Sequence, residues 1–194
     1  RAFPARIIAA LGDQPIAALV HAAGIAPAQG DSQHIIDVNL DASVRLVDAI
    51  FDRMAQGSAA ILIASNSSYF PMPPEAAAAF TAPLPAQGAV SLAHLTPRPE
   101  IAYALSKLGV RALVKREAKR FGERGVRIAS MSPGAIDTAM TQGANFDSAN
   151  RMAQASASGR MGHVDELAAV ATFLCSPKAS FVTAVDWLVD GGHT

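Results

Sequence analysis

Mainly apolar runs recur along the chain without a regular alternation with polar residues. Residues 17–23, 59–65 and 126–131 form such runs, and shorter runs follow at residues 181–183 and 185–189. A strand that is apolar at every position suits a parallel sheet covered on both faces, because both of its sides are then buried. The pattern therefore predicts five strands.

Between these runs, apolar residues recur every three or four positions, which is the spacing of one face of a helix. Residues 32–54, 101–121 and 164–175 follow this spacing, and residues 1–11 have the character of the middle or end of another helix. Alternating strands and helices predict right-handed crossovers and a doubly wound, Rossmann-like α/β sheet.

Two segments lack a clear regular pattern. Residues 69–100 are rich in proline and alanine, and residues 142–160 are rich in serine, alanine, asparagine and glycine. Within the first segment, residues 74–80 favour a helical turn. No internal repeat or second domain is evident, so residues 1–194 are interpreted as a single domain.

Charge and cysteine content narrow the functional classes. The 16 basic residues balance the 16 acidic ones, so neither nucleic acid nor an anionic membrane is expected as a partner. Cys175 is the only cysteine, and the five histidines have no metal-binding spacing, so they are interpreted as structural or surface residues. No run spans a bilayer and no signal peptide is evident, which predicts a cytoplasmic protein.

Tyr103 and Lys107 are four positions apart on a predicted helix, so their side chains share one face. An ammonium group near a phenol favours the phenolate and lowers the pKa of the tyrosine. Such a tyrosine can act as general acid or base toward a ketone or an alcohol. The spacing is common by chance, so its meaning depends on the residues around it.

Polar residues follow two of the predicted strands. Ser65 ends the run 59–65, at the edge where open α/β sheets place their ligands, and its hydroxyl can hydrogen-bond a carbonyl oxygen. Pro133, Gly134 and Thr138 follow the run 126–131. Proline and glycine make a sharp exit from a strand, which exposes backbone groups and the threonine hydroxyl to a ligand.

Together these elements resemble the short-chain dehydrogenase/reductase family. Its members carry a serine after one strand, Tyr-x-x-x-Lys on the next helix and Pro-Gly-x-x-x-Thr after the following strand, and all three occur here in that order. Asn39 resembles the family's helix asparagine. Residues 21–24 resemble its Asn-Asn-Ala-Gly strand end with both asparagines replaced, and residues 187–192 resemble its last strand and Asp-Gly-Gly ending.

The resemblance implies a role for each matching residue. Tyr103 would exchange a proton with the substrate oxygen, Lys107 would bind the nicotinamide ribose, and Asn39 would hold a relay water. Ser65 would orient the carbonyl, in preference to the serines at 67 and 68, because the family's serine follows its strand immediately. The implied cofactor-binding residues are Ala23, Gly24, Tyr103, Lys107, Pro133, Gly134, Ile136 and Thr138.

The implied function is hydride transfer between a nicotinamide cofactor and a ketone, an aldehyde or a secondary alcohol, steroid-like substrates included. NAD is favoured over NADP, the substrate is a small molecule, and a homodimer or homotetramer is expected. The alternative is a non-catalytic dinucleotide-fold protein used for binding or assembly. The methionines at 140, 152 and 161 either line an adaptable substrate pocket or fill gaps in the core.

The chain departs from the family pattern in two places. The Gly-rich phosphate loop is absent, and residue 1 aligns within a helix after that loop, so the first βαβ portion is expected upstream. Ser65 and Tyr103 are 38 positions apart, farther than in most members. The excess, residues 69–100, resembles an insertion in bacterial 3α-hydroxysteroid dehydrogenase/carbonyl reductase-like members, and we expect it to border the substrate cleft or to cover an oligomer surface.

Overall fold

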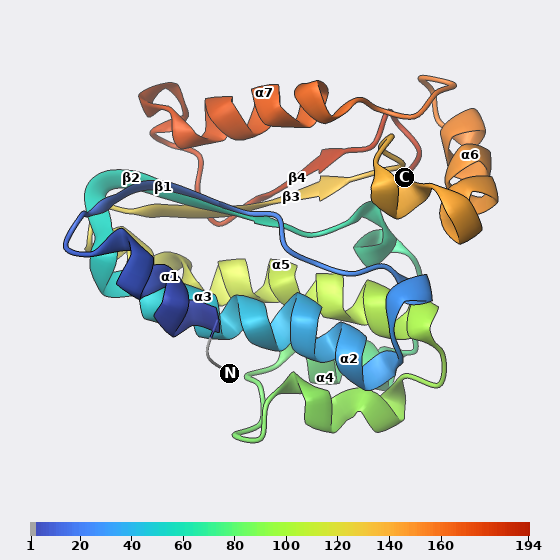
Figure 1. Ribbon diagram of the computed structural model, residues 1–194, viewed down its shortest axis with the longest axis horizontal. Coiled ribbons are helices and arrows are strands. Elements are labelled where there is room, and N and C mark those ends of the chain that lie inside the picture. The colour runs from blue at the N-terminus through green and yellow to red at the C-terminus, as the bar shows by residue number, and fades with distance from the viewer. Residues whose placement is uncertain (1–2) are drawn as a thin grey trace.

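A computed structural model describes residues 3–194 and places four parallel strands in one sheet (Figure 1). The strands are β1 (Ile16–His21), β2 (Met54–Ile63), β3 (Arg127–Pro133) and β4 (Asp186–Val189), and they are adjacent in sequence order. The predicted doubly wound, Rossmann-like sheet is confirmed. The first two residues of the predicted helix 1–11 lie outside the described residues.

The two middle strands are buried at consecutive positions. In β2 residues 58–62 are buried, and in β3 residues 128–132 are buried. The strands pair in parallel from Ala59 opposite Arg127 to Ile63 opposite Met131. Successive side chains point to opposite faces of a sheet, so burial at every position requires cover on both faces. The mainly apolar runs reflect this arrangement.

Helices form a layer on each face of the sheet (Figure 1). One layer contains α1 (Phe3–Leu11), α3 (Ala42–Ile50) and α5 (Pro99–Glu123), and the other contains α7 (Val164–Cys175). Each new strand is added on the same side of the one before, yet the last crossover runs over the opposite face. Its hand is therefore opposite to that of the two earlier crossovers, and the prediction of right-handed crossovers throughout is wrong.

The predicted helix 32–54 is divided into several turns. It consists of α2 (Ser32–Ile36), a π-helical turn at Asp37–Asp41, α3 and a 3-10 turn at Phe51–Arg53, after which β2 begins. Apolar positions 36, 40, 44, 47 and 50 keep a spacing of three or four residues through the π turn, so the pattern did not reveal it. Such turns are frequent at functional sites.

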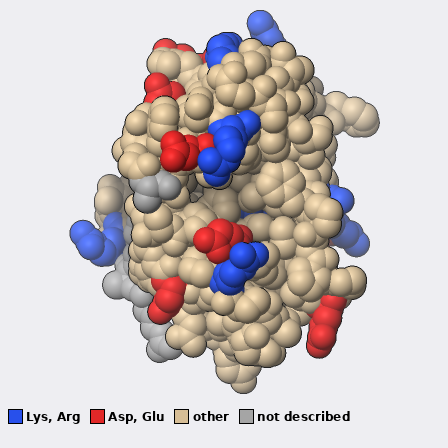
Figure 2. Space-filling view, turned by 90° about the vertical axis from the view of Figure 1, so that its right-hand side faces the viewer, with Lys and Arg blue, Asp and Glu red and all other residues tan. Residues whose placement is uncertain are grey.

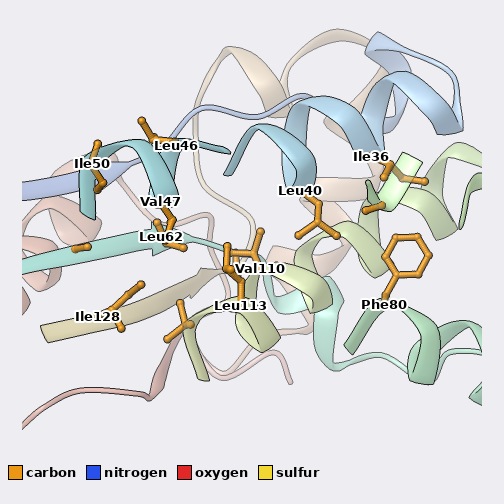
Figure 3. Close-up of a cluster of buried hydrophobic side chains, with 14 of the residues drawn as sticks. Ile36, Leu40, Leu46, Val47, Ile50, Leu62, Phe80, Val110, Leu113 and Ile128 are labelled. Atoms are coloured by element: carbon orange, nitrogen blue, oxygen red, sulfur yellow. The ribbon is translucent and has the colours of Figure 1, made fainter. Parts of the chain in front are cut away.

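Two hydrophobic clusters hold the layers together. The larger lies between the sheet and the helices of the first layer, with Leu62 and Ile128 of the strands against side chains of α3 and α5 (Figure 3). Gly109 lets α5 approach α2 and the π turn, because a Cβ there would lie 2.5 Å from Cδ2 of Leu40. On the other face, α7 packs on the sheet, and the ring of Phe173 lies 5.7 Å from that of Trp187.

The segment 69–100 is largely helical and packs on the first layer. It contains α4 (Pro74–Thr81) and a 3-10 helix at Ala89–Leu95, which confirms the helical turn favoured at residues 74–80. The buried carboxylate of Asp41 accepts hydrogen bonds from the backbone N–H groups of Ala89 (2.6 Å) and Val90 (3.0 Å). This acid therefore fixes the segment to the π turn.

Two predictions of local structure are wrong. Residues 142–160 contain α6 (Phe146–Ala155), which buries only Ala149 and Ala153, so its apolar pattern is sparse. Residues 181–183 form no strand, because the chain turns at Ala184, whose φ is +58°. None of the helices within residues 3–194 combines the length and the apolar composition of a membrane span.

Candidate active site

Ser65 and Tyr103 come together at the carboxyl edge of the sheet. Ser65 directly follows β2 and Ala64, and Tyr103 lies in the second turn of α5. The hydroxyl of Ser65 lies close enough to that of Tyr103 to lower the pKa of the phenol, against the effect of burial. Ser65 Oγ also accepts hydrogen bonds from the backbone N–H (3.2 Å) and the hydroxyl (3.0 Å) of Ser67. Of the three serines considered, Ser65 is thus the one that contacts the tyrosine, and Ser67 orients it.

Lys107 lies one helical turn beyond Tyr103 and is buried beneath it. Its Nζ donates a hydrogen bond to the backbone oxygen of Ile63 at 2.9 Å and lies 5.9 Å from the centroid of the tyrosine ring. Burial lowers the pKa of Lys107 to about 8. An ammonium group has three N–H donors, and Ile63 O engages one of them.

The pKa of Tyr103 is opposite in direction to the one predicted from the sequence. Burial raises the pKa of this phenol, and the nearby hydroxyl of Ser65 acts in the other direction. Desolvation disfavours the phenolate, and Lys107 is itself buried. In this structure the hydroxyl of Tyr103 is therefore held in its protonated form at neutral pH, and the predicted lowering by Lys107 is wrong.

Asn39 joins the π turn to the end of β1. Its Oδ1 accepts a hydrogen bond from the backbone N–H of Ile25 (2.8 Å), and its Nδ2 donates one to the backbone oxygen of the same residue (3.1 Å). Gly24 fits between these groups, because a Cβ there would lie 3.1 Å from Asn39 Oδ1 and 3.3 Å from Lys107 Nζ. The backbone at Gly24 thus passes close to two candidate site residues, whereas the side chain of Ala23 beside it is exposed.

His21 belongs to the same network, although the sequence analysis did not distinguish it from the other histidines. It is buried, and its Nε2 lies 3.0 Å from Ser43 Oγ, which donates its only proton to the backbone oxygen of Asn39 at 2.8 Å. The imidazole Nε2 must therefore be the donor to Ser43. Burial, with a smaller contribution from the charge of Lys107, lowers the pKa of His21 to about 4.

The acid stability of the protein is expected to depend on His21. The folded pKa of about 4 lies below the ordinary value of 6.5, so between these pH values the unfolded chain binds a proton that the folded chain does not. As the pH falls through this window, His21 should reduce the free energy of unfolding by about 3 kcal/mol. Urea denaturation at pH 7, 5.5 and 4.5 measures this loss.

The matched variants are His21→Asn, which should lose this part of the pH dependence, and His94→Asn, which should keep it. The side chain of His94 is exposed, so its replacement removes an imidazole that the fold does not bury. Equal acid destabilisation of wild type and His21→Asn would contradict the assignment.

Hydrogen bonds already occupy several backbone groups of the loop after β3. Gly134 donates its N–H to Val189 O at 3.1 Å, and a Cβ at this glycine would lie 2.7 Å from the Cα of Asp190. Thr138 donates its N–H to Thr141 Oγ1 (3.1 Å), and Thr141 Oγ1 donates to the backbone oxygen of Ile136 (2.6 Å). The carbonyl of Ile136 is therefore already engaged within the loop.

A cleft of about 580 Å³ opens beside Ser65 and Tyr103. It lies between the segment 26–28, the start of α5 and α6. Figure 2 looks onto this side of the molecule, which is hollowed in the middle, with acidic and basic side chains above and below the hollow. Of the predicted residues, Ser65, Tyr103 and Gly134 line it, and Thr141, which the sequence analysis missed, lines it instead of Thr138.

The cleft separates the predicted residues into two groups. Asn39, Gly24 and Lys107 lie behind Tyr103 in one connected network, whereas Pro133 pairs with Val189 at the end of β3. Met140 and Met152 line the cleft but Met161 does not.

A larger hollow of about 740 Å³ lies between residues 83–90 and the helices α2, α3 and α5, away from all of these side chains.

These features define a class of protein: a doubly wound α/β fold with serine, tyrosine and lysine at the carboxyl edge of its sheet. A family model described as enoyl-(acyl carrier protein) reductase matches residues 88–194. The 3-alpha-hydroxysteroid dehydrogenase/carbonyl reductase of Comamonas testosteroni is 31% identical over 185 residues, covering 90% of this chain and 71% of that protein.

Two further comparisons agree. The cyclohexanol dehydrogenase of Acinetobacter sp. (strain SE19) is 40% identical over 92 residues, covering 47% of this chain and only 36% of that protein. The crystal structure of the 3-alpha-hydroxysteroid dehydrogenase from Pseudomonas sp. B-0831, complexed with NADH, superposes with a TM-score of 0.85 at 28% identity and covers 98% of this chain and 77% of that one. The chain belongs to the short-chain dehydrogenase/reductase family.

Proposed function

We propose that the chain is the catalytic part of an oxidoreductase that transfers a hydride between a nicotinamide cofactor and a ketone, an aldehyde or a secondary alcohol. One observation carries the proposal: the side chains of Ser65 and Tyr103 lie close together at the wall of a mainly apolar cleft. The substrate classes named for the similar dehydrogenases, hydroxysteroids and cyclohexanol, support it.

In the reductive direction, Ser65 and Tyr103 hold the carbonyl oxygen, and Tyr103 gives its proton to that oxygen as the alcohol forms. The raised pKa of Tyr103 keeps this proton available at neutral pH. In the oxidative direction the phenolate must take the proton from the alcohol, so oxidation should become faster as the pH rises. Ser65 favours that direction, because its hydroxyl lowers the pKa of the phenol.

The residues behind Tyr103 fit a nicotinamide nucleotide, which supplies the hydride when bound. Lys107 engages one of its three N–H donors with Ile63 O, which leaves donors for ribose hydroxyl groups. Gly24 presents backbone rather than a side chain beside Lys107. NAD is favoured over NADP because the similar Pseudomonas dehydrogenase was crystallised with NADH.

A fluorescence titration of the 194-residue chain with NADH and with NADPH tests the proposal. We expect NADH to bind more tightly, and the bound nucleotide to be oxidised when a neutral ketone is added. The same titration is made on the chain extended by the βαβ portion expected upstream, which carries the phosphate loop. An extended, folded chain that binds neither nucleotide and reduces no ketone would contradict the proposal that these residues carry the activity.

We also propose that residues 69–100 are an insertion within a single domain formed by residues 1–194. Phe70 and Met72 of this segment line the cleft, and α4 and the following 3-10 helix pack against α5 and α2. The contacts of Phe70 and Met72 support the expectation that the segment borders the cleft. The packing of its helices on α5 and α2 is compatible with the other expectation, that it covers a surface used for oligomerisation in other members.

A homodimer or homotetramer is proposed for the assembled protein. Exposed apolar side chains gather near the outer strand β4, where Phe181 is fully exposed and Val185 and Leu188 are more than one third exposed. Apolar groups gathered on a surface often mark a protein interface, and an outer strand has unpaired backbone groups that a second chain can use.

A further inference from the structure

The cleft contains one charged side chain. Of the described residues that line it, Glu100 alone carries a full charge, while Phe70, Ile101 and Met152 contribute apolar wall. Glu100 is exposed, and the ion pairs formed within residues 3–194 do not include it. Its carboxylate therefore faces the cleft without a neutralising partner in the part of the chain that the structure describes.

The position of Glu100 on α5 brings this charge close to the reacting group. It precedes Tyr103 by three positions in the same helix, so the two side chains share one face with their Cβ atoms roughly 5–6 Å apart. Any substrate whose oxygen contacts Tyr103 must place its neighbouring atoms within one helical turn of the carboxylate.

We propose that Glu100 makes the cleft selective for uncharged carbonyl compounds and alcohols, and that it disfavours those with a carboxylate or a phosphate close to the reacting carbon. This inference rests on the proposed function. A second negative charge about 6 Å away is repelled enough to change binding by roughly 3- to 100-fold, depending on the local dielectric. The same anion would also leave water without gaining a lysine or an arginine among the described lining residues.

Glu100 also has a structural effect that the test must separate from selectivity. It lies in the first turn of α5, where a negative charge interacts favourably with the helix dipole. Loss of this charge–dipole interaction changes the free energy of unfolding. Any effect of that loss on the rate should be the same factor for every substrate. Only selectivity alters the ratio between a neutral and an anionic substrate.

The experiment compares 4-oxocyclohexanecarboxamide with 4-oxocyclohexanecarboxylate, which share ring, ketone and shape but differ in charge. With NADH as reductant, the wild-type chain, extended by the βαβ portion expected upstream, should show kcat/KM about 10-fold higher for the amide. In Glu100→Gln this ratio should fall close to one, and salt should reduce it in the wild type. The control Glu123→Gln removes the same charge from the far end of α5, about 34 Å away, and should keep the wild-type ratio.

An unchanged ratio in Glu100→Gln would overturn the proposal, even if both ketones are reduced well. If the chain reduces neither ketone, the proposed function fails, and the dissociation constants of the two probes, measured by ligand-detected NMR, decide the selectivity separately. A preference for the amide that disappears in Glu100→Gln supports the inference, and equal affinities of the wild type for both probes overturn it.

Discussion

Replacing Tyr103 with phenylalanine is expected to lower kcat for ketone reduction by about 10²- to 10⁴-fold, the range that general acid catalysis contributes. The change removes the hydroxyl that donates the proton and leaves the ring in place. Ser65 keeps its hydrogen bonds with Ser67, so the local backbone should not move. Fold and nucleotide affinity should therefore stay close to those of the wild type.

The chain contains one other tyrosine, which provides a matched control. Tyr69 donates its hydroxyl to Asp186 Oδ2 at 2.7 Å and is not among the residues lining the cleft. Tyr69→Phe should lower the free energy of unfolding by about 1 kcal/mol, the usual contribution of one hydrogen bond. It should leave kcat within about twofold of the wild type, because Tyr69 does not line the cleft. Near-full turnover by Tyr103→Phe would remove the proposed acid from the mechanism.

Replacing Lys107 with methionine is expected to change nucleotide affinity and stability in opposite directions. Loss of a charge-assisted hydrogen bond should weaken NADH binding by about 10- to 100-fold. The folded protein, however, no longer has to bury a charge. Because the folded pKa of Lys107 is about 8 against an ordinary 10.5, burial of this charge costs about 3 kcal/mol at neutral pH.

Two measurements separate these effects. The wild type should gain stability as the pH rises from 8 to 10.5, since only the folded chain then releases the proton of Lys107. Lys107→Met should lack this rise and should be at least as stable at pH 7, although Ile63 O loses its partner. A variant that is less stable at pH 7 and binds NADH normally would contradict both parts.

The layers of the fold and the central site were predictable because their signals are local. The helix 164–175 was predicted with the bounds that the structure gives to α7. Ser65 stands at the end of a predicted strand, and Tyr103 lies near the start of a predicted helix. Parallel strands bring residues in such positions to one edge of the sheet. The π turn was not predictable, because helical apolar spacing passes through it unchanged.

Other features depend on contacts between distant residues. The opposite hand of the last crossover depends on which face of the sheet α7 covers, which its amphipathic pattern does not specify. The role of His21 requires Ser43 and Asn39, residues of a different element. The upward shift in the pKa of Tyr103 reflects burial, which the spacing to Lys107 did not include.

The contact between Phe173 and Trp187 has a practical consequence for spectroscopy. Trp187 is the only tryptophan in the chain, and it lies on β4, the outermost strand, against α7. Its emission therefore reports on the packing at this one edge, whereas far-ultraviolet circular dichroism reports on all helices together. Denaturation curves recorded with both signals distinguish detachment of the outer strand from unfolding of the whole sheet without any introduced label.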